Sequence, residues 1–384
     1  MSVLALNLGS SSLKFKLFDT ESGSLLCGGV IDDIGKDAHA RIDAGMREVV
    51  NVSDHAGAFD FLSRLLSDRN LASTITTVVH RVVHGGESYA TATAIDETVI
   101  ARIGELASLS PLHNPINLAG ILEARKRFAD ARQVAVFDTA FYSTLEPKAY
   151  LYGIPFKYYE KYRIRKYGFH GISHEHSARR ALEALPKRPL RHVSCHLGNG
   201  SSITAIVDGK PLDTTMGFSP LQGLMMGTRS GTIDPSIVSY LEEKEGLSPK
   251  AVNAMLNKKS GILGMSEISA DVRDIYHFSK LGDERARLTL EMMAYQVRRF
   301  VGEMVAVMGG VDVISFTAGI GENAFYIRKM ALEGLEEMGI ILDADANYSN
   351  APTISAPESR VTVLVVPADE ERAMFEQAMA MELE

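Results

Sequence analysis

Cysteine and tryptophan are scarce in this chain: its 384 residues include only Cys27 and Cys195, and no tryptophan. Two cysteines are too few for a disulfide framework or for a zinc site built on thiolates. We therefore expect a reducing compartment, with both thiols buried in ordinary packing.

Long apolar runs and basic runs are also missing. No stretch approaches the roughly 20 apolar residues of a membrane span, and the opening segment 1–6 has no basic residues and is interrupted at Asn7. The net charge is −8, and no Lys/Arg-rich run marks a surface that would follow phosphates. These absences argue against nucleic acid and membranes as partners and predict a cytoplasmic protein.

The sequence has no Gly-x-x-x-x-Gly-Lys-Ser/Thr motif, which excludes a P-loop. It has instead a hairpin pattern that occurs twice. Strand-like residues 3–8 and 13–18 flank the loop 9–12, and residues 193–197 and 203–208 flank the loop 198–202. Gly/Ser loops of this kind expose backbone N–H groups to phosphate oxygens. The simplest interpretation is an internal duplication whose two loops face one another across a nucleotide cleft; two unrelated hairpin turns would also produce the pattern.

The remaining pattern predicts an α/β protein of two domains, since a chain of this length with 46% hydrophobic residues fills more than one core. Strand-like runs at 77–79 and 133–137 alternate with helical patterns at 58–66 and 116–128. After the second hairpin we expect a helix at 285–308, a strand at 311–316, a helix at about 324–338, a strand at 361–366 and a closing helix at 372–381. The domains are predicted as residues 1–145, completed by 371–384, and residues 146–370.

A third Gly-rich stretch, Gly319–Asn323, follows a strand-like run, opens a helix and has Asp343 about twenty residues later. Formally this matches a dinucleotide fingerprint, so an NAD-dependent dehydrogenase is a second candidate function. Such fingerprints normally lie in the first βαβ unit, and a dehydrogenase would leave the duplicated hairpin unexplained. We interpret the stretch as a nucleoside-binding turn.

Charged residues gather near predicted strand ends and loops. Arg81, Asp138 and Arg229 are the cations and carboxylate that phosphoryl transfer requires. The i, i+4 spacings of His80/His84 and His170/His174 suggest zinc, but a strand-like segment does not bring the first pair onto one metal. His170 is interpreted as a phosphate-facing donor.

Eight ordered motifs resemble the acetate kinase family and extend nearly end to end. They are Asn7-x-Gly-Ser-Ser-Ser-Leu-Lys14, His80–Gly86, Pro111–Pro115, Phe137–Phe141, Tyr167–Gly171, His196–Ser202, Met226–Arg229 and Phe316–Asn323. The resemblance implies a duplicated ribonuclease H-like (actin-like ATPase) fold, two domains around a nucleotide cleft, and a homodimer. The implied reaction is reversible transfer of the γ-phosphoryl group of ATP to acetate, giving acetyl phosphate and ADP, a step toward acetyl-CoA.

The resemblance also implies roles for individual residues. Asn7 and Glu370 would hold Mg²⁺, with Mn²⁺ as a substitute. Asp138, His170, Arg229 and Arg81 would be catalytic. Substrate binding would involve Arg81, Val83, Leu112, His113, Phe169 and Pro220. The nucleotide would be bound by Lys14, His196, Leu197, Gly198, Asn199, Gly200, Asp271, Val272, Arg273, Gly319, Ile320, Gly321, Glu322 and Asn323.

The chain departs from the family pattern at Leu8, where alanine is usual, at Val272, where phenylalanine is usual, and at Ala368-Asp369, where Thr-Asn is common. None of these changes removes a charged group from the implied site. A carboxylate acceptor is already ionised at neutral pH and needs no general base, so we expect direct in-line transfer. A propionate kinase of the same family and a non-catalytic actin-like nucleotide switch are further candidate functions.

Overall fold

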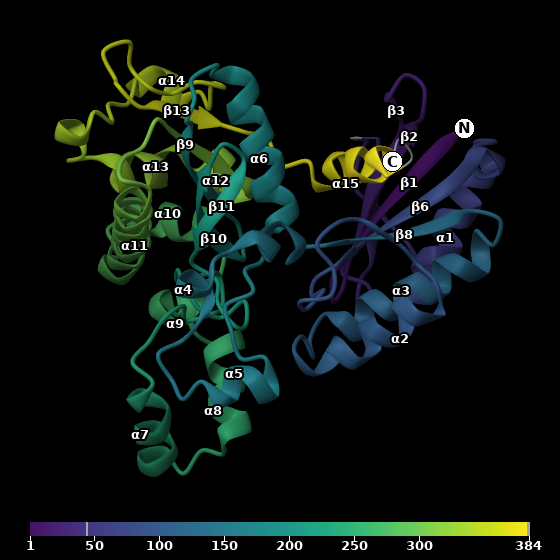
Figure 1. Cartoon of the computed structure of the whole chain (residues 1–384), viewed down its shortest axis with the longest axis horizontal. Helices are drawn as coiled ribbons and strands as arrows, with labels where there is room; N and C mark the ends of the chain where they lie inside the picture. Colours follow the sequence, from purple (N-terminus) through teal and green to yellow (C-terminus); the bar gives the residue numbers. More distant parts are fainter. Residues whose placement is uncertain (44, 382–384) are drawn as a thin grey trace. The chain divides into compact units, whose positions relative to one another are not determined.

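A computed structural model describes residues 1–43 and 45–381. The chain forms two compact units (Figure 1), Met1–Ser143 with Asp369–Glu384, and Thr144–Ala368. We call them unit 1 and unit 2. Asp369 and Glu370 thus belong to unit 1, two residues before the boundary that the sequence analysis placed at 370/371.

Unit 1 contains an eight-stranded sheet in the order β5-β4-β3-β2-β1-β6-β8-β7. Its strands are β1 (Ser2–Leu8), β2 (Leu13–Asp19), β3 (Leu25–Asp32), β4 (His39–Ile42), β5 (Glu48–Val49), β6 (Ile75–Val82), β7 (Thr93–Ala94) and β8 (Arg132–Phe137). Helices α1 (His55–Asp68), α2 (Glu97–Glu105) and α3 (Asn114–Arg127) lie on one side, and α15 (Glu370–Ala380) lies on the other. Because helices cover both faces of its centre, every residue of β1 is buried.

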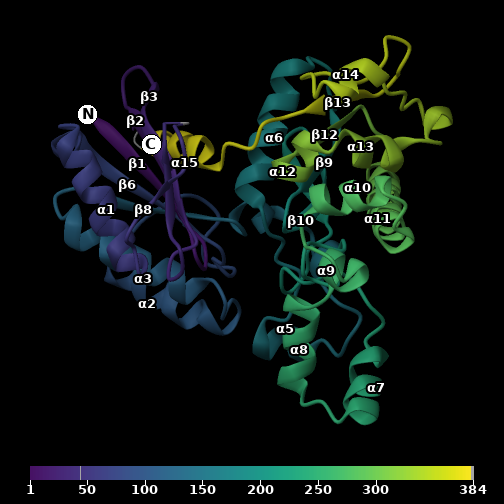
Figure 2. The ribbon, with the colours of Figure 1, turned by 180° about the vertical axis from the view of Figure 1, so that it is seen from behind.

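Unit 2 contains a five-stranded sheet in the order β11-β10-β9-β12-β13. The strands are β9 (Arg191–Leu197), β10 (Ser201–Val207), β11 (Lys210–Thr214), β12 (Val313–Thr317) and β13 (Thr362–Val365). Helix α6 (Gly171–Ala184) covers one face, and α10 (Val272–Lys280), α11 (Glu284–Met308) and α13 (Phe325–Leu332) lie on the other, as Figure 2 shows from behind. The remaining helices are α4 (Pro147–Tyr150), α5 (Lys157–Tyr162), α7 (Ser236–Glu245), α8 (Pro249–Lys258), α9 (Gly261–Ser266), α12 (Ala318–Asn323) and α14 (Ala344–Tyr348).

The two sheets share one topology. The run β3-β2-β1-β6-β8 corresponds to β11-β10-β9-β12-β13, with antiparallel pairing between the first three strands and parallel pairing between the last three in both cases. Both predicted hairpins are present, as β1–β2 and β9–β10. The α/β class and the predicted duplication are therefore confirmed.

One predicted element is wrong. The helix expected at 324–338 is divided, because α13 ends at Leu332 and a separate 3₁₀ turn follows at Glu336–Met338. Gly334 lies between them with φ of 82°, a left-handed conformation that interrupts a right-handed helix. The other predicted helices and strands of the second half are found within a few residues of their expected bounds.

Both cysteines are free and buried, as predicted. Among the described residues, no helix combines the length and the apolar character needed to cross a membrane.

Candidate active site

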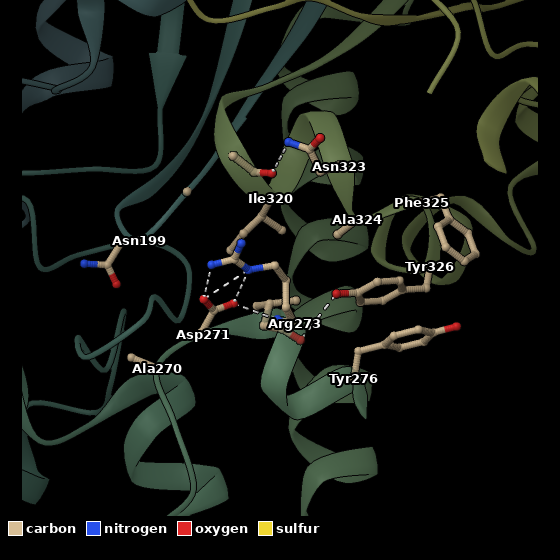
Figure 3. A pocket seen from close by; sticks show the side chains of 13 residues that line it. Asn199, Ala270, Asp271, Arg273, Tyr276, Ile320, Asn323, Ala324, Phe325 and Tyr326 are labelled. Atoms are coloured by element: carbon tan, nitrogen blue, oxygen red, sulfur yellow. Dashed lines mark hydrogen bonds and ion pairs between the residues drawn. The ribbon is translucent and has the colours of Figure 1, made fainter. Parts of the chain in front are cut away.

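Unit 2 holds a cavity of about 750 Å³ beside the second hairpin loop. It is lined by Gly198, Asn199, Ala270, Asp271, Val272, Arg273, Tyr276, Gly319, Ile320, Asn323, Ala324, Phe325 and Tyr326 (Figure 3). The cavity thus brings together three segments that lie far apart in the sequence and that were all predicted to bind nucleotide.

The ends of two helices shape this cavity. Asp271 caps α10 by accepting a hydrogen bond from the backbone N–H of Arg273 at 2.8 Å, and the two side chains form an ion pair at 2.6 Å. On the opposite wall, β12 passes directly into α12 through Ala318, whose φ is 66°. This tight connection puts Gly319 and Ile320 in the first turn of α12, at the edge of the cavity.

Aromatic side chains form a wall that the sequence analysis missed. The rings of Tyr276 and Tyr326 stack with centroids 3.7 Å apart and planes 6° apart, and the Tyr326 hydroxyl donates to the Val272 carbonyl at 3.3 Å. Burial raises the pKa of Tyr326 to about 12, so the phenol stays protonated and remains a donor. A stacked wall of this kind suits a flat ring. The aromatic pair directly after Asn323 and Ala324 was the available sequence signal.

Some predicted nucleotide residues lie next to the cavity rather than in its wall: His196, Leu197, Gly200, Gly321 and Glu322. Gly321 and Glu322 are held from behind by Arg328, which is fully buried and donates to both of their carbonyls, at 2.7 and 2.9 Å. Lys14, also predicted for nucleotide, belongs to unit 1 and is exposed on β2.

Gly200 is the point where two predicted catalytic residues meet. A Cβ atom added to Gly200 would lie 3.1 Å from His170 Nε2 and 3.6 Å from Arg229 Nη1. His170 has a left-handed backbone, φ 57° and ψ 25°, immediately before α6. That conformation is sparsely populated by non-glycine residues and is concentrated at functional sites.

The Arg229 guanidinium contacts a neutral acceptor instead of a carboxylate. Its Nη1 donates to the Pro220 carbonyl at 3.1 Å, and burial lowers its pKa. In residues 1–43 and 45–381, no carboxylate forms an ion pair with it. A partly buried cation of this kind attracts an anionic ligand.

Unit 1 contains a second charged cluster, at the ends of β6 and β8. Arg81 donates to Asp138 through two bonds, Nε to Oδ1 at 3.0 Å and Nη2 to Oδ2 at 2.7 Å, and Nη1 donates to Asn7 Oδ1 at 3.1 Å. Asp138 is 1% exposed. Burial would lower the pKa of Arg81, but the neighbouring Asp138 and Glu370 outweigh this effect and raise it.

Asn7 also connects this cluster to the start of α15. Its amide nitrogen lies 2.9 Å from Glu370 Oε2 and 3.2 Å from Glu371 Oε1. Burial raises the pKa of Glu371, and the nearby charge of Glu370 raises it further. The carboxyl groups of Asp138, Glu370 and Glu371 lie near Arg81. Together with the amide oxygen of Asn7 they form an oxygen-rich, acidic donor set, which fits Mg²⁺ or Mn²⁺. Glu371 was not predicted, although it directly follows Glu370.

Another acidic group can be explained without a metal. Ligand atoms of Asp32, Asp33 and His39 lie within 4.8 Å of one another. Arg47 donates to both carboxylates, at 3.0 and 2.9 Å, which accounts for the cluster.

The predicted acyl-binding residues are divided between the two units. Val83, Leu112 and His113 belong to unit 1, where the end of β6 meets the start of α3, and Phe169 and Pro220 belong to unit 2. The Val83 N–H donates to Asn117 at 3.1 Å, which fixes this end of β6 to α3. Val83 is 7% exposed and Leu112 is 52% exposed.

Two interpretations that the sequence left open lose their support. Asp343, the acidic residue of a dinucleotide fingerprint, instead caps α14 by accepting from the backbone N–H groups of Asp345 and Ala346. His80, whose spacing to His84 suggested zinc, has its Nε2 2.8 Å from Gln133 Oε1. The Asp343 carboxylate therefore serves as a helix cap, and the contact with Gln133 accounts for the buried ring of His80.

Residues 2–376 match the model of the acetokinase family. The chain is 47% identical to an acetate kinase of Caldicellulosiruptor saccharolyticus, over 97% of each chain, and 46% identical to an acetate kinase of Bacillus cytotoxicus, over 96% of each. Among solved structures, it is similar to the acetate kinase of Porphyromonas gingivalis (TM-score 0.91, 40% identity, 99% of each chain). It is also similar to a propionate kinase of Francisella tularensis (TM-score 0.93, 36% identity, 98% of each chain).

Proposed function

This chain belongs to the acetokinase family, and from that premise we propose which of its residues carry the reaction. It is a phosphotransferase with a carboxyl group as acceptor, an acetate kinase. The proposed reaction is reversible: a carboxylate oxygen of acetate attacks the γ-phosphorus of ATP, the bond from that phosphorus to the bridging oxygen breaks, and acetyl phosphate and ADP are formed.

This proposal is supported by one feature of unit 2: Gly198 and Asn199 line a cavity of about 750 Å³, and His170 Nε2 and Arg229 Nη1 converge on Gly200 in the same loop. The adenine ring would lie against the Tyr276–Tyr326 wall. Within the loop 198–200 the Gly198 N–H donates to the Gly200 carbonyl at 3.0 Å, and the backbone N–H groups of Asn199 and Gly200 would face the phosphates.

His170 and Arg229 would stabilise the transferring phosphoryl group. Its three equatorial oxygens carry the charge in the transition state, and a preorganised cation or N–H donor acts most strongly there. Arg229 is suited to this role because no carboxylate in the described parts of the chain neutralises it. Attack by acetate on an anionic phosphate is opposed by repulsion, which Arg229 would offset.

Arg81 would orient the acetate carboxylate. Its guanidinium is already fixed by Asp138, so little side-chain entropy is lost when a second anion binds. Acetate is ionised at neutral pH, and Asp138 is therefore assigned to orientation of Arg81 rather than to proton abstraction. Val83 and Leu112 of unit 1, with His113 beside them, and Phe169 and Pro220 of unit 2 are the residues that we assign to the methyl group.

Asn7 and Glu370 would hold Mg²⁺, with Glu371 as their neighbour. Bound Mg²⁺ supplies positive charge that neutralises phosphate oxygens. Removal of divalent ions with a chelator should abolish turnover, and Glu370→Gln should weaken Mg²⁺ binding in a direct titration. Full Mg²⁺ affinity in Glu370→Gln would remove this residue from the metal site.

The function itself is tested by a hydroxamate assay with ATP, Mg²⁺ and either acetate or propionate. We expect acyl phosphate from both acids, with acetate preferred. A propionate kinase is the second candidate, favoured by the similarity to the Francisella tularensis enzyme. A higher kcat/KM with propionate would establish it, and no acyl phosphate from either acid would contradict both.

We also propose a cytoplasmic homodimer, as the sequence and the resemblance imply. Sedimentation equilibrium would report twice the chain mass of 41.9 kDa. A monomer that is fully active would contradict the dimer as the working unit.

A further inference from the structure

The face of the unit 2 sheet beneath α6 is unusually polar. On β9 the residues facing away from α6, Val193, Cys195 and Leu197, belong to the apolar core. The alternate residues on β9, and most of those next to them on β10, β12 and α6, are serines, histidines and threonines. Each is at most 8% exposed: His192, Ser194, His196, Ser202, Thr204, Ser315, Thr317, Ser173, His174 and Ser177. Only beside His192 are the neighbouring strand residues apolar, Ile206 on β10 and Val313 on β12. Burial of so many polar groups is unfavourable unless each finds a partner.

Hydrogen bonds link three of these side chains and His170 one after another. Ser194 Oγ lies 2.8 Å from His174 Nδ1, His174 Nε2 lies 2.7 Å from Ser202 Oγ, and Ser202 Oγ lies 2.9 Å from His170 Nδ1. This chain of hydrogen bonds runs from the buried centre of β9 to His170. The far nitrogen of His170, Nε2, is the atom beside Gly200. His196 stacks on His170 with ring centroids 4.2 Å apart, but its Nδ1 lies 2.8 Å from Ser173, outside this chain.

The chemistry of the buried side chains determines which group donates in each hydrogen bond of this chain. Burial, with the nearby His196 and His192, lowers the pKa of His174 well below its usual value, so this ring is neutral and carries one N–H. Within the described residues, the Ser194 hydroxyl has only His174 Nδ1 as a hydrogen-bond partner. Its proton must therefore point to Nδ1, because the reverse orientation leaves a buried O–H donor unpaired.

The positions of the other protons follow from that of the Ser194 proton. With Nδ1 accepting, the N–H of His174 is at Nε2 and donates to Ser202. The Ser202 hydroxyl has accepted one bond and donates its own proton to His170 Nδ1. A neutral His170 must then carry its proton on Nε2.

We propose that Ser194, His174 and Ser202 are positioning residues that hold His170 in the Nε2–H tautomer, so that it presents an N–H donor at Gly200. This proposal rests on the proposed role of His170 as a donor to the phosphoryl group. It explains why Ser194, His174 and Ser202 are polar although all three are buried beneath α6 or within it.

The direct test is the tautomer of His170, read from ¹⁵N-histidine NMR spectra of the full-length enzyme at neutral pH, with His170→Gln used for assignment. In wild type we expect a protonated Nε2 and an unprotonated Nδ1. Ser194→Ala removes the first donor without touching His170, and we expect a mixture of both tautomers. A wild-type proton on Nδ1, or a pure Nε2–H form in Ser194→Ala, would overturn the proposal.

Ser177→Ala is a matched control. Ser177 Oγ bonds Ser315 Oγ at 2.7 Å, and Ser315 lies next to Ser194 on the neighbouring strand, but this pair leads to His192 instead of His170. The control should lose similar stability and keep both the His170 tautomer and kcat.

Kinetics give a second readout. Ser202→Ala should lower kcat by about 10- to 100-fold, as loss of a partner that orients a functional histidine does elsewhere, with KM for ATP and acetate nearly unchanged. Ser202→Thr, which keeps the hydroxyl, should recover most of this loss. An unchanged kcat in Ser202→Ala would contradict the proposal. If His170→Ala retains full turnover, the catalytic role of His170 fails, whereas the tautomer measurement still tests the chain.

Discussion

At the scale of single residues, Arg229 and Arg81 are cations in very different surroundings. Arg81 is bound through two hydrogen bonds to a buried carboxylate, whereas Arg229 contacts a carbonyl, and no carboxylate pairs with it in the part of the chain that the structure describes. A carboxylate that already pairs with an arginine reduces the charge that arginine offers to a ligand. Arg229 should therefore contribute most where charge develops, in the transition state.

We predict that Arg229→Ala lowers kcat by about 10³-fold or more, with a much smaller rise in KM for acetate. Steady-state kinetics with both substrates measure this. Arg273→Ala is the comparison, because Arg273 is exposed at the nucleoside cavity and pairs with Asp271; it should change KM for ATP more than kcat. Unchanged turnover in Arg229→Ala would remove Arg229 from the site.

Val83 is expected to limit the length of the acyl chain that the enzyme accepts. Val83→Ala removes two methyl groups from the proposed wall, so kcat/KM for propionate and butyrate should rise relative to acetate, since each misfitting methylene is worth about 1–3 kcal/mol in an apolar site. KM for ATP should stay nearly unchanged. If the three acids keep their wild-type ratios, Val83 is ordinary strand core.

Residue roles were predictable from sequence where a short motif carries the chemistry, as for Arg81, Asp138 and Arg229. They were missed where the partners come from separate segments. Tyr276 and Tyr326 stack although they lie far apart in the sequence, and Ser202 lies between His170 and His174 only after β10 and α6 pack together. No local pattern contains that information.

Among the secondary-structure elements, α15 packs on unit 1 although it follows unit 2 in the sequence. Phe375 is 5% exposed and stacks on Phe18 at 4.8 Å, and the Arg372 guanidinium lies 4.4 Å from the Phe18 ring centroid. The same helix carries Glu370 and Glu371 to Asn7. Its docking thus positions the proposed metal site.

We predict that Phe375→Ala lowers the free energy of unfolding of unit 1 by about 3–5 kcal/mol, the usual cost of removing a buried ring. ADP binding by unit 2, measured by calorimetry, should be nearly unchanged. Tyr348→Ala is a control, because Tyr348 is 68% exposed, and it should change stability little. A stable Phe375→Ala protein would contradict the proposed anchoring of α15.

Elements with a strong local period were predicted well, as for the two hairpins and α11. The division of the predicted helix 324–338 and the separate α12 were missed. Ala318 takes a left-handed φ at the start of α12, and alanine gives no local signal for that conformation.

At the scale of the whole molecule, the duplication was visible in sequence only at the two Gly/Ser hairpins. The other strand pairs, such as β3 with β11, share a place in the topology without a shared motif. Sheet order depends on long-range pairing, which local patterns do not encode. That the Ser10 and Asn199 loops meet one nucleotide stays a prediction, and a crystal structure with a bound ATP analogue would test it.

Four buried histidines should make the stability of the folded protein depend on pH. Burial lowers the pKa of His80 and His84 to about 4 and of His192 to about 3, and lowers that of His174 well below its usual value. In the unfolded chain each has a pKa near 6.5, so between pH 6.5 and about 4 the unfolded state binds more protons. Stability therefore falls as pH falls through this range, by up to about 1.4 kcal/mol per pH unit for each histidine that stays neutral in the folded state. A melting temperature that is flat from about pH 7 to 4.5 would contradict this.

In the proposed reaction the γ-phosphoryl group of ATP is transferred directly to a carboxylate. The most direct test of this transfer uses ATP made chiral at the γ-phosphorus with oxygen isotopes, incubated with acetate, Mg²⁺ and the wild-type enzyme. We expect the label in acetyl phosphate with inverted configuration, as a single in-line displacement requires. Retention at phosphorus, which needs a phosphorylated enzyme and two displacements, or no labelled acetyl phosphate at all, would contradict it.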